Sequence, residues 1–523
     1  MTSVYVAALH RTLPRLLASF NLDLTSELGG VGDRYHWGWK LIDFPNGTYQ
    51  AAAHGLAILL RFKLLPDYLS ESEALDYIRI AVSGLRSITA KNGSLDEALP
   101  GESSYCVTAL VAADILAARE LLSDHLSTVE KHEWLEIVRP LIQFLNKQDE
   151  HHALISNHLA SGALAMFRWH AAIGDSASED RGKHWLERIL ANQSEEGWFS
   201  EYGGADPGYQ SWCTTQLAQL SILRPDLGLA GALARSLAFL VYAAHPDGSF
   251  GGSYGSRNTR FLLPGGIELL RLQNDNANAL STFARTSIDD FKCVTLDCID
   301  SGNLVPFFND YALAASAAIE DEGEADQLEL PCNSNCGRKW LPDSGWLVDC
   351  GLRHYSIINL KRGGAAVHFL DKMRLADDPG VVARDGDGSI YSSQLSHADE
   401  LPGIQAIANE LQLQFALLPV KRPVPHALEF IILRLLSLTA LKSLHLGNLV
   451  KRFLAYLLIS RKPRPVGYVV RQYRLGEKFG ITDAIKANTE VQQVMGSRYF
   501  SAIHMASQGY WQRGDRDFLE RGK

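Results

Sequence analysis

The feature that most constrains this chain is a change of hydrophobic period near residue 320. Before that point, apolar residues recur with the spacing of amphipathic helices. The connections between the apolar stripes are rich in Gly, Asp, Asn and Pro, which favour helix ends and turns. The pattern predicts about twelve paired helices, each burying one face. The stripes lie at 4–21, 49–64, 71–89, 104–121, 129–147, 153–172, 179–193, 209–223, 228–244, 261–273, 276–288 and 307–319.

The second part of the chain follows a charge-rich run, EDEGEADQLE at 320–329, which predicts a solvated linker. Short alternating or β-branched segments then follow, separated by glycine-rich turns, as is typical of antiparallel sheets. They lie at 345–352, 354–360, 365–370, 389–395, 412–419 and 466–473. We therefore expect a multidomain α+β protein, with a helical domain at 1–325, a linker at 326–340 and an antiparallel β-sandwich at 341–523.

One segment interrupts the predicted sandwich with a helical period. Residues 426–460 are apolar and carry several Lys and Arg, and we place the whole insertion at 424–461. A basic amphipathic helix can lie on an anionic membrane surface. The alternatives are packing against the sandwich or against a partner subunit, so peripheral membrane contact and an oligomer interface both stay open.

Composition excludes some classes of function. The net charge of −9 over 523 residues argues against non-specific binding to nucleic acid. The seven cysteines are sparse and odd in number, which favours reduced, partly buried thiols over a disulfide framework. They also lack partners for a zinc ligand set, and we expect neither metal nor cofactor. The N-terminal segment reads as an amphipathic helix rather than a signal peptide, which predicts a cytoplasmic protein.

The first candidate site is Asn157-His158, at the start of the helical stripe ISNHLASGALAMFRWH. A helix N-terminus favours anions such as carboxylates. The amide can polarise a carboxyl group and the imidazole can move a proton. The alternative is a capping Asn followed by a surface His.

The second candidate site is the loop at 195–209, EEGWFSEYGGADPGY. Its carboxylates and phenols can serve as acid and base, and its glycines allow backbone to approach a ligand. The candidates are Trp198, Glu201, Tyr202, Asp206 and Tyr209. The alternative is that Asp206 ends a loop and Tyr209 begins the next helix.

Two further loops carry candidates. In HPDGSFGGSYGSRNTR, at 245–260, Arg257 offers a bidentate fork for a carboxylate, and His245, Tyr254 and Asn258 accompany it. In RYHWGW, at 34–39, a proton carrier and two flat aromatic faces suit one sugar subsite, unless they form an interdomain contact. The candidates in this loop are His36, Trp37 and Trp39.

Bacterial heparinase II/III-like proteins resemble this chain in four segments that occur in the same order: SNHLASGALAM, EEGWFSEYGGADPGYQ, HPDGSFGGSYGSRNT and SGWLVDCGLRHYSIINLKRGG. The resemblance implies an incomplete (α/α) toroid before the sandwich, and polysaccharide lysis by β-elimination. Asn157-His158 fits the family's Asn-His at a helix start. Tyr202 or Tyr209 would supply the phenol, and His245 or Arg257 would lie across the cleft.

The leading hypothesis is therefore a lyase acting on an acidic, uronate-containing polysaccharide or oligosaccharide, by removal of the proton next to the carboxylate. A uronyl C5-epimerase would share that first step. An inverting glycoside hydrolase using Glu201 and Asp206 is the alternative enzyme class. A non-catalytic glycan-binding or scaffold protein of exopolysaccharide biosynthesis is the alternative outside enzymes.

Overall fold

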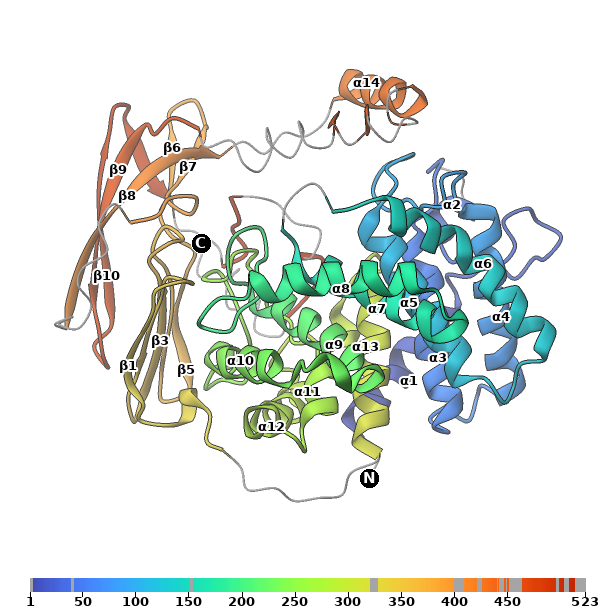
Figure 1. The fold of residues 1–523 in the computed structure, drawn as a ribbon. Helices are drawn as coiled ribbons and strands as arrows, with labels where there is room; N and C mark the ends of the chain where they lie inside the picture. Colours follow the sequence, from blue (N-terminus) through green and yellow to red (C-terminus); the bar gives the residue numbers. More distant parts are fainter. Residues whose placement is uncertain are drawn as a thin grey trace.

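The computed structural model describes residues 3–38, 42–150, 154–319, 328–398, 409–420, 426–439, 441, 446–447, 449–450, 463–494, 498–502 and 508–512. Helices form one side of the molecule and antiparallel sheets the other, with a further helix set apart from both (Figure 1). This confirms the predicted α+β architecture of a helical toroid, a β-sandwich and a helical insertion.

The helical domain consists of two concentric rings. The inner ring contains α3 (Ala52–Arg61), α5 (Tyr105–Leu121), α7 (Ser156–Ile173), α9 (Pro207–Leu223), α11 (Gly265–Leu270) and α13 (Leu304–Ile319). The outer ring contains α4 (Glu71–Ile88), α6 (Thr128–Lys147), α8 (Ser176–Ala191), α10 (Ala230–Leu240), α12 (Asp275–Asp289) and α1 (Val4–Leu17). The short α2 (Arg34–Trp37) precedes the first inner helix.

Each inner helix packs on its two neighbours in the ring, and α13 packs on both α11 and α3. The toroid is therefore closed, not incomplete as the family resemblance implies, because α1 at the start of the chain pairs with the last inner helix. Helix direction alternates between inner and outer rings, so all inner helices begin at the same end. That end collects their unpaired N–H groups and positive dipole ends.

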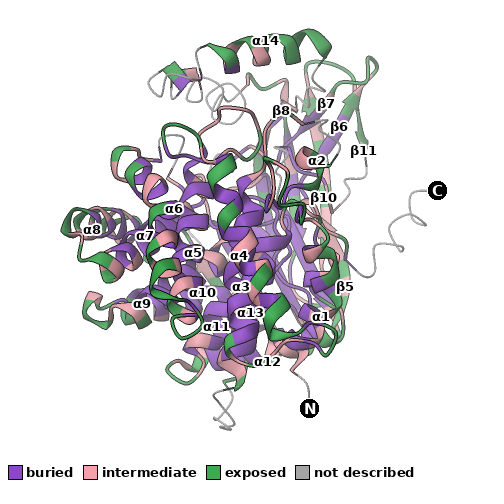
Figure 2. Ribbon diagram, turned by 90° about the vertical axis from the view of Figure 1, so that its right-hand side faces the viewer, coloured by how far each residue is buried: buried purple, intermediate pink, exposed green. Residues whose placement is uncertain are grey.

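Burial explains why the helices sort into two rings. Inner helix α5 buries nearly all of its first fourteen residues, because it has neighbours on every side. Outer helix α4 buries only one stripe and begins with a capping box between Ser70 and Glu73. Figure 2 shows the same contrast, with buried residues concentrated on the inner helices.

The sandwich consists of two stacked sheets. The first has the order β1-β2-β3-β4-β5, with antiparallel pairing throughout. It contains β1 (Gly337–Leu341), β2 (Trp346–Cys350), β3 (His354–Asn359), β4 (Ala365–Leu370) and β5 (Met373–Asp378). Successive side chains of β2 point to opposite faces of this sheet. Trp346 and Val348 join the core of the toroid, whereas Leu347 packs toward the second sheet. The first sheet is thus a middle layer. Strand β1 occupies the end of the range predicted as linker.

The second sheet has the order β10-β9-β8-β7-β6-β11. It contains β6 (Val382–Asp385), β7 (Ile390–Ser392), β8 (Glu410–Val420), β9 (Gly467–Arg474), β10 (Gly480–Ala487) and β11 (Val491–Val494). Its inner face packs through Phe415 and Val469 against the first sheet.

The predicted insertion contains α14 (Ala427–Leu438), and most of its remaining residues lie outside the described part of the chain. Within that part, no helix is both long and apolar enough to cross a bilayer. Cys336 and Cys350 form a disulfide across the first two strands, with Cα atoms 5.4 Å apart. The prediction of reduced thiols is therefore wrong for these two cysteines, because β1 and β2 pair with Gly337 opposite Cys350, and this brings the adjacent Cys336 close to Cys350.

Candidate functional site

Candidate residues gather at the end of the toroid where the inner helices begin. Cys106 is the second residue of α5, Asn157 and His158 are the second and third of α7, and Tyr209 is the third of α9. Since these helices are neighbours in the ring, their first turns lie side by side. We call the following residues the toroid-end cluster: Glu97, Cys106, Glu150, Asn157, His158, Glu201, Tyr202, Tyr209 and Arg257.

The buried floor of the cluster is a carboxylate with two donors. Glu201 is held in place by a short β-bridge between its backbone and Ile155, just before α7. Asn157 Nδ2 donates to Glu201 Oε2 at 2.7 Å, and Arg257 Nη1 donates to Glu201 Oε1. The side chains of Asn157, Glu201 and Arg257 are all buried. Burial raises the pKa of Glu201, and the nearby Arg257 charge, which lowers it, only partly offsets this.

Two half-exposed tyrosines lie above this floor. The Arg257 guanidinium lies 4.1 Å from the ring centroid of Tyr209 and 4.9 Å from that of Tyr202. Tyr209 also stacks on Trp212, with nearly parallel rings 6.2 Å apart. Tyr202 has a φ of 53°, a left-handed conformation that costs energy in a non-glycine residue and is typical of functional loops. Both phenols are thus fixed beside a buried cation.

His158 is the half-exposed cationic group of the cluster. Its Nδ1 lies 2.8 Å from Oε2 of the buried Glu150, and its ring also hydrogen-bonds the Cys106 thiol. Burial disfavours the charged imidazole, but the neighbouring Cys106 and the Glu150 carboxylate raise the pKa of His158 above its usual range. The carboxylate beside the ring thus favours the protonated form of His158.

Glu97 is a further carboxylate at this end of the toroid. It lies in the loop before α5, is open to solvent, and accepts a hydrogen bond from Ser104. Sequence analysis missed Glu97, Cys106 and Glu150, because no local motif distinguishes them from ordinary loop or helix residues.

Asp206 belongs to the same region but is committed to holding the backbone. Its Oδ1 accepts from the backbone N–H of Tyr209 and from the hydroxyl of Thr259, and its Oδ2 accepts from the backbone N–H of Arg257. It is buried and caps α9. Asp206 therefore ends the loop and begins the next helix, which is the alternative to a catalytic role that the sequence left open.

Four other candidates from the same loops contact other parts of the protein: His245, Tyr254, Trp198 and Asn258. Buried His245 bonds Ser249 and the Tyr254 hydroxyl, and burial lowers its pKa to about 3. Tyr254 packs edge-on against Trp346 of the first sheet. Trp198 donates to Glu196, and the Asn258 amide donates to backbone carbonyls near the C-terminus.

The aromatic loop before α3 is engaged locally. His36 bonds the carbonyl of Ile42, and the Trp37 indole donates to the carbonyl of Ser19. Arg34 lies over the Trp37 ring at 4.6 Å. Trp39 lies outside the described residues.

The first sheet holds the loop that carries Arg257. Arg260 forms a bidentate pair with Asp377 of β5, at 2.8 and 3.1 Å, and both side chains are buried. Arg374 of β5 pairs with Asp247 at 2.9 Å. Because such pairs fix orientation, the sandwich positions Arg257 although it supplies no residue to the cluster.

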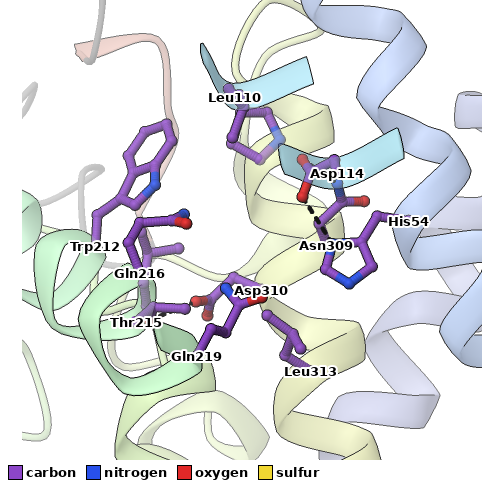
Figure 3. A pocket seen from close by; sticks show the side chains of 12 residues that line it. His54, Leu110, Asp114, Trp212, Thr215, Gln216, Gln219, Asn309, Asp310 and Leu313 are labelled. Atoms are coloured by element: carbon purple, nitrogen blue, oxygen red, sulfur yellow. Dashed lines mark hydrogen bonds and ion pairs between the residues drawn. The ribbon is translucent and has the colours of Figure 1, made fainter. Parts of the chain in front are cut away.

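A small polar pocket continues along the axis of the toroid (Figure 3). Its cavity of about 20 Å³ has room for one water molecule. On one side of it, His54 Nδ1 lies 2.7 Å from Asp114 Oδ1, and Asn309 donates to Asp114 at 3.0 Å. Trp212 lines the pocket and also stacks on Tyr209, so the pocket adjoins the cluster.

Asp310, which lines this pocket, gives a prediction for stability against pH. Burial raises its pKa to about 7, although Gly265 and Thr215 donate to its carboxyl group. Between roughly pH 4 and 7 the unfolded chain releases a proton that the folded chain keeps, so stability falls as pH rises, by roughly 4 kcal/mol at most. The free energy of unfolding, measured with urea at several pH values in this range, should fall less steeply with pH for Asp310→Asn than for the wild type. Equal slopes in both proteins would contradict a protonated Asp310.

The described residues contain no group of three or more His, Cys, Asp or Glu side chains that could hold a metal ion.

The sequence matches no protein-family model and no curated protein. Several solved structures are similar to the fold. A Paenibacillus xanthan lyase aligns over 79% of this chain and 44% of its own, with 11% identity and a TM-score of 0.41. A Streptomyces coelicolor chondroitin AC lyase aligns over 80% and 67%, with 10% identity and a TM-score of 0.49. A GH127 β-L-arabinofuranosidase from Geobacillus stearothermophilus aligns over 80% and 71%, with 11% identity and a TM-score of 0.39. The chain thus spans less than half the length of the xanthan lyase.

Proposed function

We propose that this protein is a carbohydrate-active enzyme that cleaves an acidic, uronate-containing polysaccharide or oligosaccharide by β-elimination at the toroid-end cluster. One observation carries the proposal. The half-exposed Tyr209 ring lies 4.1 Å from the buried Arg257 guanidinium, and His158, paired with Glu150, stands in the first turn of the neighbouring helix α7. A phenol, a cation behind it and a second cation facing solvent are what removal of a proton next to a carboxylate requires.

Substrate charge follows from the groups that face solvent. His158 presents a positive charge, and the first turns of α5, α7 and α9 add the positive ends of three helix dipoles. Both favour an anion such as a uronate carboxylate. The half-exposed rings of Tyr202, Tyr209 and Trp212 offer flat faces for sugar rings.

The reaction assigns a role to each group. The Tyr209 oxygen takes the C5 proton while His158 neutralises the adjacent carboxylate. The electron pair forms the C4–C5 double bond, the C4–O bond breaks, and the leaving oxygen takes a proton from Tyr209 or Tyr202. Arg257 is buried on Glu201, so it acts from behind the ring by stabilising negative charge on the phenol. Asn157 and Glu201 hold Arg257 in place.

The alternatives differ in what they need from the same residues. Inverting hydrolysis through Glu201 and Asp206 is disfavoured, because three donors occupy the Asp206 oxygens away from solvent. A C5-epimerase would use the same base and differ only in returning the proton to carbon. A glycan-binding protein would not need a phenol held beside a cation.

The test is purified protein against a panel of uronate-containing glycans, read three ways. Elimination produces an unsaturated uronate with an ultraviolet chromophore, together with new reducing ends. Reducing ends without the chromophore would contradict elimination and indicate hydrolysis. Exchange of solvent deuterium into C5 without cleavage would indicate an epimerase. No signal in any assay across the panel would favour the glycan-binding protein.

A further inference from the structure

The turn between β3 and β4, with the sequence LKRGG at 360–364, has a backbone that requires glycine. Gly363 and Gly364 have φ angles of 62° and 71°, in the left-handed region that favours glycine. A Cβ on Gly363 would lie 2.3 Å from the carbonyl oxygen of Ser393, and one on Gly364 would lie 2.0 Å from the Tyr473 hydroxyl. The turn is therefore packed tightly against the second sheet, which fixes its backbone.

This turn places Arg362 beside the two loops that carry the toroid-end cluster. Arg362 Nε donates to the carbonyl of Ser253 at 3.1 Å. Ser253 is four residues before Arg257, a separation of at most about 14 Å along the chain. The charge of Asp206, three residues before Tyr209, also acts on the Arg362 guanidinium. Arg362 thus comes from the sandwich but lies next to the candidate site of the toroid.

The charge of Arg362 has no carboxylate paired with it among the described residues. Other arginines at this junction do have such partners: Arg257, Arg260 and Arg374 each form an ion pair. Asp206 does not serve Arg362 in this way, because its oxygens accept from three other donors. Burial, only partly offset by Asp206, lowers the pKa of Arg362 to about 10, so the group is still a cation at neutral pH.

A partly buried cation without a counter-charge is suited to binding an anion. The Arg362 side chain is only partly buried, so a ligand has access to it. Its Nε is occupied by Ser253, and the two Nη groups remain as a planar pair of donors for the oxygens of a carboxylate or a sulfate. A bound anion would also offset the free-energy cost of burying an uncompensated charge.

We propose that Arg362 is an anion-binding residue that holds a carboxylate or sulfate group of the glycan, on a sugar near the one that reacts at the toroid-end cluster. The link to the reacting sugar rests on the proposed function, whereas the binding of an anion does not. A glycan with charges on neighbouring sugars would contact the toroid and the sandwich together. Polyanionic chains are therefore the substrate class that Arg362 favours over glycans with isolated uronates.

Modification of the full chain with phenylglyoxal, followed by peptide mass spectrometry, measures whether an anion covers Arg362. The probes are trigalacturonate, which carries only carboxylates, sulfated maltotriose, which carries only sulfates, and neutral maltotriose. We expect an anionic probe to slow the modification of Arg362 and the neutral probe to have no effect. The anionic probe that protects better identifies the group that is bound. Arg353, exposed just before β3, is the control and should react equally with every probe.

A variant tests the same site by affinity. Arg362→Gln should weaken binding of the protecting probe by about 10-fold in calorimetry, because a charged hydrogen-bond donor is lost. The matched control, Arg474→Gln, changes an exposed arginine of β9 and should bind like the wild type. The modification assay uses the unaltered chain, so it decides the question even where the variant does not fold.

The outcomes separate this proposal from the proposed function. Absence of protection by both anionic probes would overturn it, as would equal protection by neutral maltotriose or an unchanged Kd in Arg362→Gln. Protection without any elimination would leave the anion site standing and count against the proposed reaction. Elimination with an unchanged KM in Arg362→Gln would remove Arg362 from substrate binding and leave the proposed reaction unaffected.

Discussion

Replacing Tyr209 by phenylalanine is expected to lower turnover by about 10²-fold or more, with substrate binding little changed. Phenylalanine keeps the ring against Arg257, Trp212 and Phe261, so packing is preserved. Only the oxygen that would take the C5 proton is lost. The measurement is kcat and KM on the glycan that gives elimination, with thermal unfolding to show that the fold is intact.

Two companion variants make this result specific. Tyr202→Phe removes the other phenol beside Arg257, and a smaller loss would identify Tyr209 as the base. Tyr468→Phe changes an exposed tyrosine on β9 and should leave turnover unchanged. Turnover of Tyr209→Phe close to that of the wild type would exclude its hydroxyl from the chemistry. A raised KM with unchanged kcat would assign Tyr209 to binding alone.

The fold was largely predictable because period and burial agree in most elements. The expected strand at 365–370 is β4 itself, and the expected helix at 104–121 differs from α5 by one residue. The strands that were missed carry charges or lie at edges. In β5 the sequence MRLADD ends in two acidic residues, yet pairing with β4 and ion pairs to the toroid hold it as a strand. The sequence pattern within a short segment carries no information about partners that are distant along the chain.

The closure of the toroid was not predictable for the same reason. It depends on α1 and α3, near the N-terminus, packing against α13 more than two hundred residues later. Helical period identifies each element and its buried face, but leaves open whether a stack of helix pairs closes. Contacts between the ends of the domain decide this.

The candidate site was predictable to the level of loops but not of individual residues. The Asn-His pair and the glycine-rich loop at 195–209 do contribute to one cluster. Within the loop at 245–260, however, Arg257 points into the cluster whereas His245 bonds Tyr254 beneath the first sheet. Composition does not separate these outcomes, because the pairing of the loop with β5 determines which side chains turn inward. Glu150 was missed because only the fold brings it to His158.

Loss of the Arg257 side chain is expected to affect stability as well as activity. In Arg257→Ala the Glu201 carboxylate stays buried without its cation, and breaking a buried ion pair in this way costs about 3–5 kcal/mol. Binding and turnover should both fall, and Arg257→Lys should not restore them, since an ammonium lacks the flat guanidinium that pairs with Glu201 while lying against the Tyr202 and Tyr209 rings. Chemical denaturation and kcat/KM measure the two effects separately.

Adding Glu201→Gln to Arg257→Ala removes the uncompensated charge, so the double variant should regain most of the stability while staying inactive. An Arg257→Ala protein as stable as the wild type would show that the pair is not buried in solution. Recovery of activity in the double variant would show that Arg257 serves only to neutralise Glu201, and would remove it from the proposed chemistry.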